Sequence, residues 1–289
     1  QDMHHYSDEH LTEYLNKNKF DFVGISFIAG YYQYRKILKI SEAINNSNNR
    51  PFYIIGGHGP SPEPEFFLKK TKADVVVIGE GEITIVELIK SVAKKKSLDN
   101  MKGIAFLKDN KIVINERRSL IKDIDNIPFP AYDLFPINYY RLLRMPHVEN
   151  SDFVMPILSG RGCPFKCTFC YRMDEGFRPR SNESVIEEIK YLKHKYGITY
   201  IAFSDELLMS SEERVTILCE DFIKNKLNIN WDCNGRLNYA KPEVLKLMKK
   251  AGCVFINYGI ESMDDLVLKN MKKGLTTELI IKGIETTLK

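Results

Sequence analysis

Three of the six cysteines lie close together in a glycine-containing stretch, Gly160 to Tyr171. Cys163, Cys167 and Cys170 have the spacing C-x3-C-x2-C. Thiolates are the soft ligands that iron–sulfur clusters require. A [4Fe–4S] cluster has four irons, so three protein thiolates leave one iron that a small molecule could chelate. The spacing therefore predicts a [4Fe–4S] cluster with one open iron.

Zinc is the main alternative for these cysteines. A structural zinc site needs a fourth Cys or His nearby, and the next one after Cys170, His194, is 24 residues further on in an expected helix. A third interpretation, that the three cysteines are unpaired structural thiols, is less favoured than zinc. No cysteine precedes Cys163, and a disulfide framework would be spread more evenly, so the pattern favours a metal site in a reducing cytoplasm. The remaining cysteines are expected in the core: Cys219, Cys233 and Cys253.

The cysteine loop must be positioned by a second half in which short apolar strands alternate with amphipathic helices. Four strand–helix units do not close a barrel, and the chain stops inside an expected helix, so we expect a partial (β/α) barrel over 151–289. Polar residues follow the strands, where barrel active sites are built. Strands are expected at 153–158, 200–203, 229–233 and 254–258, and helices at 182–196, from Ser210, and at 241–251. The polar strand-end residues are Ser204, Asp205, Glu206, Arg236, Gly259, Glu261 and Ser262.

The first half, 1–118, has continuous apolar strands separated by amphipathic helices. This pattern is typical of a doubly wound α/β domain, whose parallel sheet is covered on both faces. The domain is expected to be incomplete at its N-terminus. Residues 119–150 carry four prolines among aromatics without a helical period, which indicates an extended linker. The expected strands are 22–27, 52–55 and 74–78, followed by a hairpin of 103–107 and 112–114.

Small residues follow the strands of the first half. Glycine lets a backbone approach a ligand closely, at the edge where open α/β sheets bind ligands. These residues do not form the dinucleotide-binding motif G-x-G-x-x-G. Their order along the chain is therefore more informative about the ligand than the number of glycines. They are Ser26, Gly56, Gly57, His58, Gly79, Glu80 and Gly81.

The cysteine spacing and the strand-end residues together resemble the radical SAM superfamily. In that family the three cysteines bind the cluster, and S-adenosylmethionine (SAM) chelates the fourth iron. Reduction then cleaves SAM to methionine and a 5′-deoxyadenosyl radical. The resemblance places Phe169 near the adenine and implies SAM contacts for the strand-end residues, with Arg236 paired to the SAM carboxylate. The sequence Ser204-Asp205-Glu206 departs from the family's Gly-Gly-Glu, whereas Gly259-Ile260-Glu261-Ser262 matches its Gly-Ile-Glu-Ser.

The order of strand-end motifs in the first half resembles the cobalamin-binding domain fused to many radical SAM enzymes. Val23-Gly24-Ile25-Ser26 is followed by Gly56-Gly57-His58 and then by Val77-Ile78-Gly79-Glu80-Gly81-Glu82. The resemblance implies that these loops contact cobalamin. The D-x-H-x-x-G motif that supplies a lower cobalt ligand in other cobalamin proteins is absent. We therefore interpret His58 as a loop histidine in preference to a cobalt ligand.

The resemblance implies a cobalamin-dependent radical SAM enzyme, most often a methyltransferase acting on an unactivated carbon. Radical cyclisation or rearrangement remains an alternative, as does a first domain that binds substrate. A methylthiotransferase would carry further cysteines in its first domain, and a SAM- or cobalamin-binding regulator would not need the cluster. The expected partners are a small-molecule substrate or biosynthetic intermediate and an electron donor such as flavodoxin or ferredoxin.

Composition excludes several other classes of protein. The net charge is +4, from 42 basic and 38 acidic residues that are interspersed, so nothing indicates a nucleic-acid partner. No apolar run approaches the roughly 20 residues that a membrane span needs. The first residues are polar and do not form a signal peptide.

Overall fold

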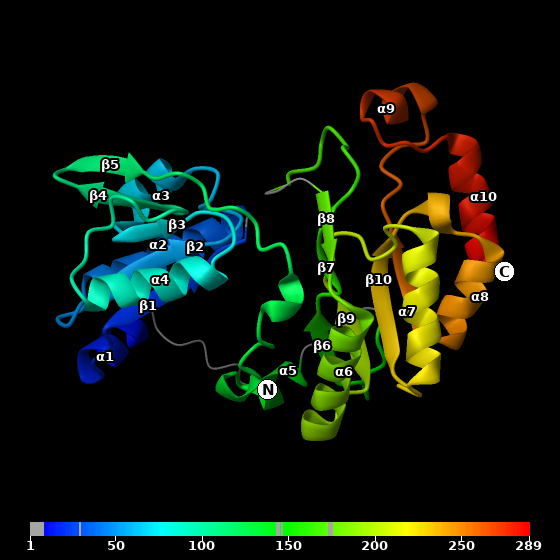
Figure 1. Ribbon diagram of the computed structural model, residues 1–289, viewed down its shortest axis with the longest axis horizontal. Helices are drawn as coiled ribbons and strands as arrows, with labels where there is room; N and C mark the ends of the chain where they lie inside the picture. Colours follow the sequence, from blue (N-terminus) through cyan, green and yellow to red (C-terminus); the bar gives the residue numbers. More distant parts are fainter. Residues whose placement is uncertain (1–8, 29, 143–144, 146, 173–175) are drawn as a thin grey trace. The chain divides into compact units, whose positions relative to one another are not determined.

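The computed structural model describes residues 9–28, 30–142, 145, 147–172 and 176–289. It divides into two compact units, Gln1–Ile121 and Lys122–Lys289 (Figure 1). Each unit has hydrophobic clusters of its own, and each is described separately.

Unit 1 is built on a five-stranded sheet in the order β1-β2-β3-β4-β5. The first three strands pair in parallel, and β4 and β5 add an antiparallel hairpin at one edge. Asp109 and Asn110 turn this hairpin with positive φ, as two-residue turns require. The strands are β1 (Phe22–Ser26), β2 (Phe52–Gly56), β3 (Val75–Val77), β4 (Ile104–Lys108) and β5 (Lys111–Ile114).

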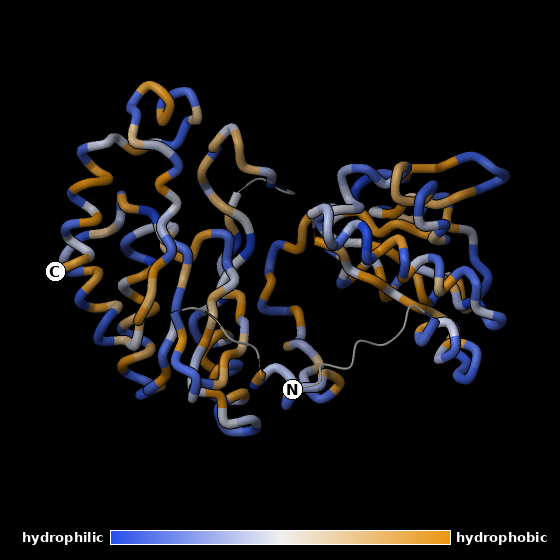
Figure 2. Tube along the Cα trace, turned by 180° about the vertical axis from the view of Figure 1, so that it is seen from behind, coloured by the Kyte–Doolittle hydropathy of each residue, from blue (hydrophilic) through white to orange (hydrophobic). Residues whose placement is uncertain are grey.

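Helices cover both faces of the unit 1 sheet. Tyr53 and Ile55 of β2 pack in one cluster with residues of α1, α2 and α3, and Ile54 packs in another with Leu88 of α4. Successive residues of a strand point to opposite faces, so the apolar run in β2 serves both clusters. The helices alternate hydrophobic and hydrophilic residues along their length (Figure 2). They are α1 (His10–Lys17), α2 (Tyr31–Asn45), α3 (Pro64–Thr71) and α4 (Glu82–Ala93).

Unit 2 contains a four-stranded parallel sheet in the order β11-β10-β9-β6. One face packs against α6, α7 and α8, around the buried indole of Trp231. Cys219 and Cys233 lie in this core, as predicted. The strands are β6 (Val154–Ile157), β9 (Tyr200–Phe203), β10 (Asn230–Gly235) and β11 (Cys253–Tyr258). The helices are α6 (Asn182–Tyr196), α7 (Glu212–Lys224), α8 (Pro242–Lys250), α9 (Asp265–Asn270) and α10 (Thr277–Leu288).

Two features of unit 2 are additions to the expected elements. Residues 160–163 and 176–179 form an antiparallel hairpin, β7 (Gly160–Cys163) and β8 (Gly176–Pro179). The proline-containing segment 122–150 includes the short helix α5 (Ile137–Tyr140) and buries Tyr132 and Ile137 in the unit 2 core. Its aromatic residues therefore stabilise unit 2. Among the described residues, no helix is both long enough and apolar enough to cross a membrane.

Candidate functional site: the cysteine loop and its anchors

Cys163 ends β7 of the β7–β8 hairpin, and the cysteine loop, described over residues 163–172, follows from this strand. Gly162 allows this close pairing, because it has φ +83° and a Cβ there would lie 2.3 Å from the Gly176 carbonyl oxygen. Cys163 is half-buried, Cys167 is buried and Cys170 is exposed. Burial raises the pKa of the Cys163 thiol. One strand pair thus holds both ends of the loop.

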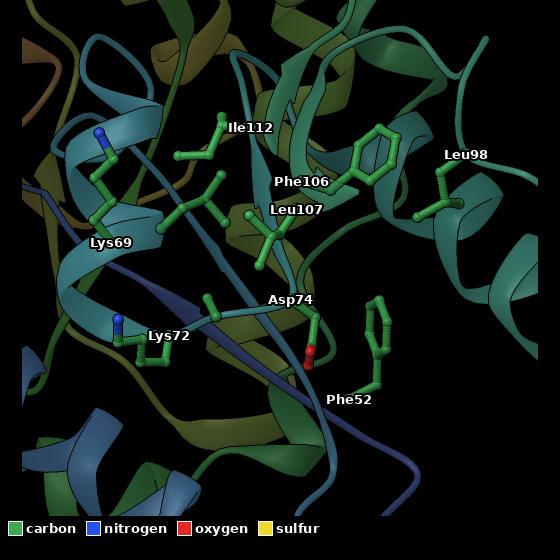
Figure 3. A pocket seen from close by; sticks show the side chains of 10 residues that line it. Phe52, Lys69, Lys72, Asp74, Leu98, Phe106, Leu107 and Ile112 are labelled. Carbon is green, nitrogen blue, oxygen red and sulfur yellow. The ribbon is translucent and has the colours of Figure 1, made fainter. Parts of the chain in front are cut away.

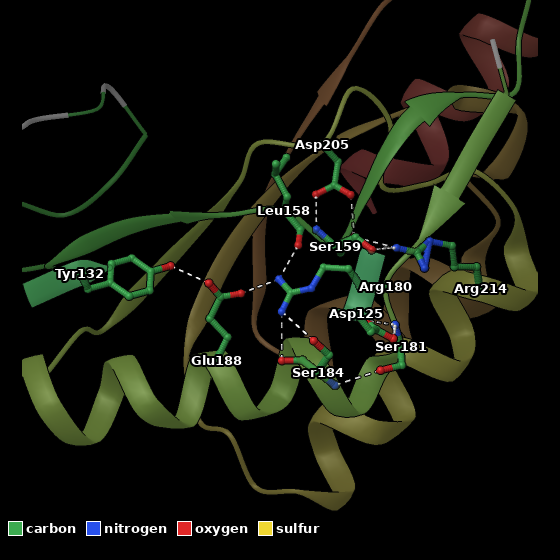
Figure 4. Close-up of polar contacts among 10 residues, drawn as sticks. All are labelled: Asp125, Tyr132, Leu158, Ser159, Arg180, Ser181, Ser184, Glu188, Asp205 and Arg214. Atoms are coloured by element: carbon green, nitrogen blue, oxygen red, sulfur yellow. Dashed lines mark hydrogen bonds and ion pairs between the residues drawn. The ribbon is translucent and has the colours of Figure 1, made fainter. Parts of the chain in front are cut away.

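The first strand of the hairpin is anchored by a buried carboxylate at the end of β9. Asp205 is 1% exposed, and its two oxygens accept hydrogen bonds from the backbone N–H (2.9 Å) and hydroxyl (2.7 Å) of Ser159 (Figure 4). Arg214 of α7 donates to the carbonyl oxygen and hydroxyl of the same serine, at 2.8 and 2.7 Å. Burial raises the pKa of the Asp205 carboxyl, against the opposing effects of Ser159 and Arg214. Both carboxylate oxygens are therefore engaged within the protein.

The second strand ends at an ion pair whose carboxylate is buried and whose arginine is partly buried. Arg180 follows β8, donates to the Leu158 carbonyl oxygen at 2.8 Å and pairs with Glu188 of α6 (Figure 4). Glu188 is 2% exposed and also accepts a hydrogen bond from the Tyr132 hydroxyl at 2.6 Å. Burial, together with this carboxylate, raises the pKa of Tyr132. A buried ion needs partners of this kind, so the network fixes where the hairpin leaves the sheet.

Arg236, at the end of β10, lies against the cysteine loop. It is 5% exposed, and its Nη1 is 3.7 Å from the Cys167 Sγ. Its guanidinium lies 3.6 Å from the centroid of the Phe165 ring. Its Nη2 donates to the Lys273 carbonyl oxygen, and its Nε donates to the Asn238 side chain at 3.2 Å. All three nitrogens thus have partners within unit 2.

A second buried cation, Lys273, gathers several of the predicted SAM residues. Lys273 is 6% exposed; its Nζ is 3.1 Å from the Glu261 Oε1 and 5.5 Å from the centroid of the Phe169 ring. A Cβ at Gly259 would lie 2.7 Å from the Glu261 carboxylate, so glycine makes room for this pair. Lys273 was not predicted as a site residue, because nothing in Lys272-Lys273-Gly274 distinguishes it from a surface lysine.

The remaining predicted SAM residues are less closely associated. Ser204 and Glu206 are exposed on either side of buried Asp205, and the Ser262 hydroxyl accepts a hydrogen bond from the Asp264 N–H at 3.1 Å. Within the part of the chain that the structure describes, no three Cys, His, Asp or Glu side chains converge as a metal-binding group.

In unit 1, the predicted cobalamin residues follow the carboxyl ends of neighbouring parallel strands. Ser26 of β1 pairs with Gly56 of β2, and both Ser26 and His58 are exposed. Gly57 has φ +97°, and a Cβ there would lie 2.6 Å from the Phe27 carbonyl oxygen, so this glycine is required by the loop itself.

The loop after β3 is more open. Gly79 has φ +80°, and its N–H donates to the Ser61 hydroxyl at 3.1 Å. The Glu80 carboxylate accepts from the Ile121 N–H at 2.8 Å. Gly81 has φ −89°, and a Cβ there would meet no atom closer than 3.8 Å. The backbone at Gly81 is thus accessible to a ligand.

A cavity of about 390 Å³ in unit 1 lies away from these loops (Figure 3). It is lined by Phe52, which begins β2, and by Asp74, which precedes β3. Gly56 ends β2, on the order of 13 Å along the strand from Phe52. The cavity is therefore at the amino ends of the strands and is separate from the predicted cobalamin loops.

Comparison with known proteins identifies both halves of the chain. Residues 157–289 match the Radical SAM superfamily, and residues 2–89 match the B12 binding domain. The chain belongs to the cobalamin-dependent radical SAM superfamily, in which a B12 binding domain precedes the radical SAM domain. The predicted family and fold class are confirmed, and the predicted cofactor set (the [4Fe–4S] cluster, SAM and cobalamin) is that of this class.

Relatives with different activities cover most of this chain. An uncharacterized methyltransferase of Pyrococcus horikoshii, PH0819, is 31% identical over 96% of this chain and 60% of its own length. The anaerobic magnesium-protoporphyrin IX monomethyl ester cyclase of Rubrivivax gelatinosus is 27% identical over 96% of this chain and 50% of its own length. The chain thus spans half to three-fifths of these relatives.

The fold is also seen in a solved structure. The cobalamin-dependent SAM radical enzyme OxsB, with aqua-cobalamin and SAM bound, matches 97% of this chain and 41% of its own chain with a TM-score of 0.78 and 23% identity. At this identity the similarity concerns the fold.

Proposed function

We propose that this chain is the cofactor-binding part of a cobalamin-dependent radical SAM methyltransferase acting on an unactivated carbon of a small molecule. The observation that carries the proposal is the cysteine loop: three thiols on a hairpin-tethered loop, next to the buried cation Arg236, in a chain that begins with a B12 binding domain. The methyltransferase relative supports methyl transfer in particular.

The residues present fit the proposed cofactors. Cys163, Cys167 and Cys170 supply the thiolate donors that the cluster requires. Phe169, Gly259 and Glu261, three of the residues predicted to contact SAM, lie around the Lys273 ammonium. In unit 1 the open backbone at Gly81 and the exposed Ser26 suit a corrin. When bound, the reduced cluster supplies the electron that cleaves SAM, and the corrin supplies a methyl carrier.

The protein's own residues would bind and orient these groups. The Asp205 and Glu188 networks fix the two ends of the cysteine-bearing hairpin, and close packing of Gly162 against Gly176 joins its strands.

The electron donor we propose is a flavodoxin or ferredoxin.

Methyl transfer is tested by anaerobic turnover of the full-length protein with candidate substrates and SAM carrying a trideuterated methyl group. We expect a product with three deuterium atoms, together with equal amounts of S-adenosylhomocysteine and 5′-deoxyadenosine, measured by mass spectrometry. A control in which Cys163, Cys167 and Cys170 are all changed to Ala should lose the roughly four irons per chain that the wild type binds. Iron that stays bound in this control would refute the cluster assignment.

Radical cyclisation is the second candidate function, favoured by the similarity to the Rubrivivax gelatinosus cyclase. The same experiment separates the two reactions. A cyclase would release 5′-deoxyadenosine without S-adenosylhomocysteine, and its product would contain no deuterated methyl group. Absence of both SAM products, with cobalamin bound, would instead favour a regulator.

A further inference from the structure

Arg236 connects the end of β10 to the cysteine loop at two points. Its guanidinium lies on the Phe165 ring, and its Nη1 reaches the Cys167 Sγ at 3.7 Å. Phe165 and Cys167 are two residues apart on that loop, so both contacts hold the same short segment. The guanidinium is held in turn by the Lys273 carbonyl oxygen and the Asn238 side chain.

This arrangement places a fixed positive charge beside a predicted cluster ligand. Hydrogen bonds to the sulfurs of an iron–sulfur cluster and the local charge both affect its reduction potential. Reduction adds negative charge to the cluster, so a nearby cation stabilises the reduced state. Arg236 is 5% exposed, and at such a buried position water screens the interaction little. Arginine remains charged under all ordinary conditions and has a rigid, planar set of donors.

We propose that Arg236 is a positioning residue that holds Phe165 and Cys167 in place and raises the reduction potential of the cluster. The inference rests on the proposed function, since it needs the cluster. It differs from the role that the sequence predicts for Arg236, which is pairing with the SAM carboxylate. The two roles are distinguished by measuring the potential without SAM.

The test is an anaerobic redox titration of the reconstituted full-length protein in the absence of SAM, with the reduced cluster measured by electron paramagnetic resonance. We expect Arg236→Gln to lower the midpoint potential by at least 59 mV, a tenfold change for a one-electron couple. Arg236→Lys keeps the charge but loses the planar fork, so we expect partial rescue of the potential and of the iron content. Asn238→Ala is the matched control: it removes the partner of Nε and a hydrogen bond to the Gly274 carbonyl oxygen but keeps the Arg236 charge, so it should leave the potential unchanged.

Two kinds of failure are distinguishable. If the wild type binds no cluster, the proposed function is wrong. If the wild type binds one and its SAM-free potential is unchanged in Arg236→Gln, this inference is wrong, whatever happens to SAM affinity. Loss of iron from a variant whose apo form melts like the wild type supports the positioning role. Should Arg236→Gln fail to fold, Arg236→Met, which removes the charge and keeps an unbranched side chain, carries the test, and an unchanged potential there overturns the inference.

Discussion

Asp205 follows β9 and has both carboxylate oxygens hydrogen-bonded to Ser159, the residue before β7. The sequence predicts a SAM contact for it, from its place in the order of strand-end motifs. The structure adds a structural role, because this carboxylate and Arg214 together hold the serine from which the cysteine-bearing hairpin begins. Single residues at the site can thus serve its geometry without facing a ligand.

The buried Asp205 carboxyl gives a pH-dependence of stability. Its pKa in the folded protein is raised, chiefly by burial, so just above the ordinary pKa of an aspartic acid the folded state holds a proton that the unfolded state has lost. Stability contributed by this group is therefore present at low pH and is lost as the pH rises through the raised pKa. Denaturant unfolding of wild type and Asp205→Asn at a series of pH values should show this fall only in the wild type. Parallel pH profiles would contradict it.

At the scale of elements, the β7–β8 hairpin determines where the cysteine loop is held. The hairpin has two glycines with positive φ at its loop end, where Gly162 pairs with Phe177 and Gly176 pairs with Cys163. Their surroundings differ: a Cβ at Gly162 would meet the Gly176 carbonyl oxygen at 2.3 Å, whereas a Cβ at Gly176 would meet nothing within 4 Å. Substitution of these two glycines therefore distinguishes the effect of a steric clash, at Gly162, from the effect of backbone strain alone, at Gly176.

Gly162→Ala should prevent the hairpin from closing and greatly reduce the iron bound after reconstitution. Gly176→Ala should cost only the backbone strain, about 1–2 kcal/mol, and keep the iron. Iron content and thermal melting of both variants measure the difference. Equal iron content in the two variants would show that the close approach at Gly162 does not control the loop.

At the scale of the whole molecule, the two predicted cofactor sites draw on different units. The cysteines lie in unit 2, and the glycine loops lie in unit 1, each supported by hydrophobic clusters of that unit. We therefore expect the two cofactors to load independently.

Gly81 and Gly57 give the means to test cobalamin loading. Gly81→Val should keep the fold, because φ is negative and the site is open, but its side chain should block the corrin. Gly57→Val is not a clean test, because its side chain would clash with Phe27 and destabilise unit 1 itself.

The measurement is incubation with hydroxocobalamin, desalting and a visible spectrum, alongside iron analysis. We expect about one corrin per chain in the wild type and in the triple cysteine variant, and none in Gly81→Val, which should still bind iron. If the wild type retains no corrin, the first domain does not bind cobalamin and the methyltransferase proposal fails. Corrin retained by Gly81→Val would place the ligand elsewhere.

Local patterns in the sequence were sufficient for most elements and for the predicted metal ligands. The helix expected at 182–196 is α6 (Asn182–Tyr196), since its apolar spacing is local and Ser181 caps its first turn. The three cysteines lie within eight positions of the sequence, so their spacing alone predicts a cluster. The order of apolar strands likewise predicts both α/β domains, because a strand that is buried on both faces is a run of consecutive apolar residues.

The tertiary structure decided what depends on residues far apart in the chain. Arg236 and Cys167 are separated by 69 positions, and Asp205 and Ser159 by 46, so no local period connects them. Lys273 becomes part of the site only because the chain after β11 returns to the cysteine loop, where Thr168 donates to the Met271 carbonyl oxygen at 3.0 Å. Sequence patterns record which face of an element is buried, but the partner of a buried charge is chosen by folding, because that charge must find a counter-group wherever the chain brings one within reach.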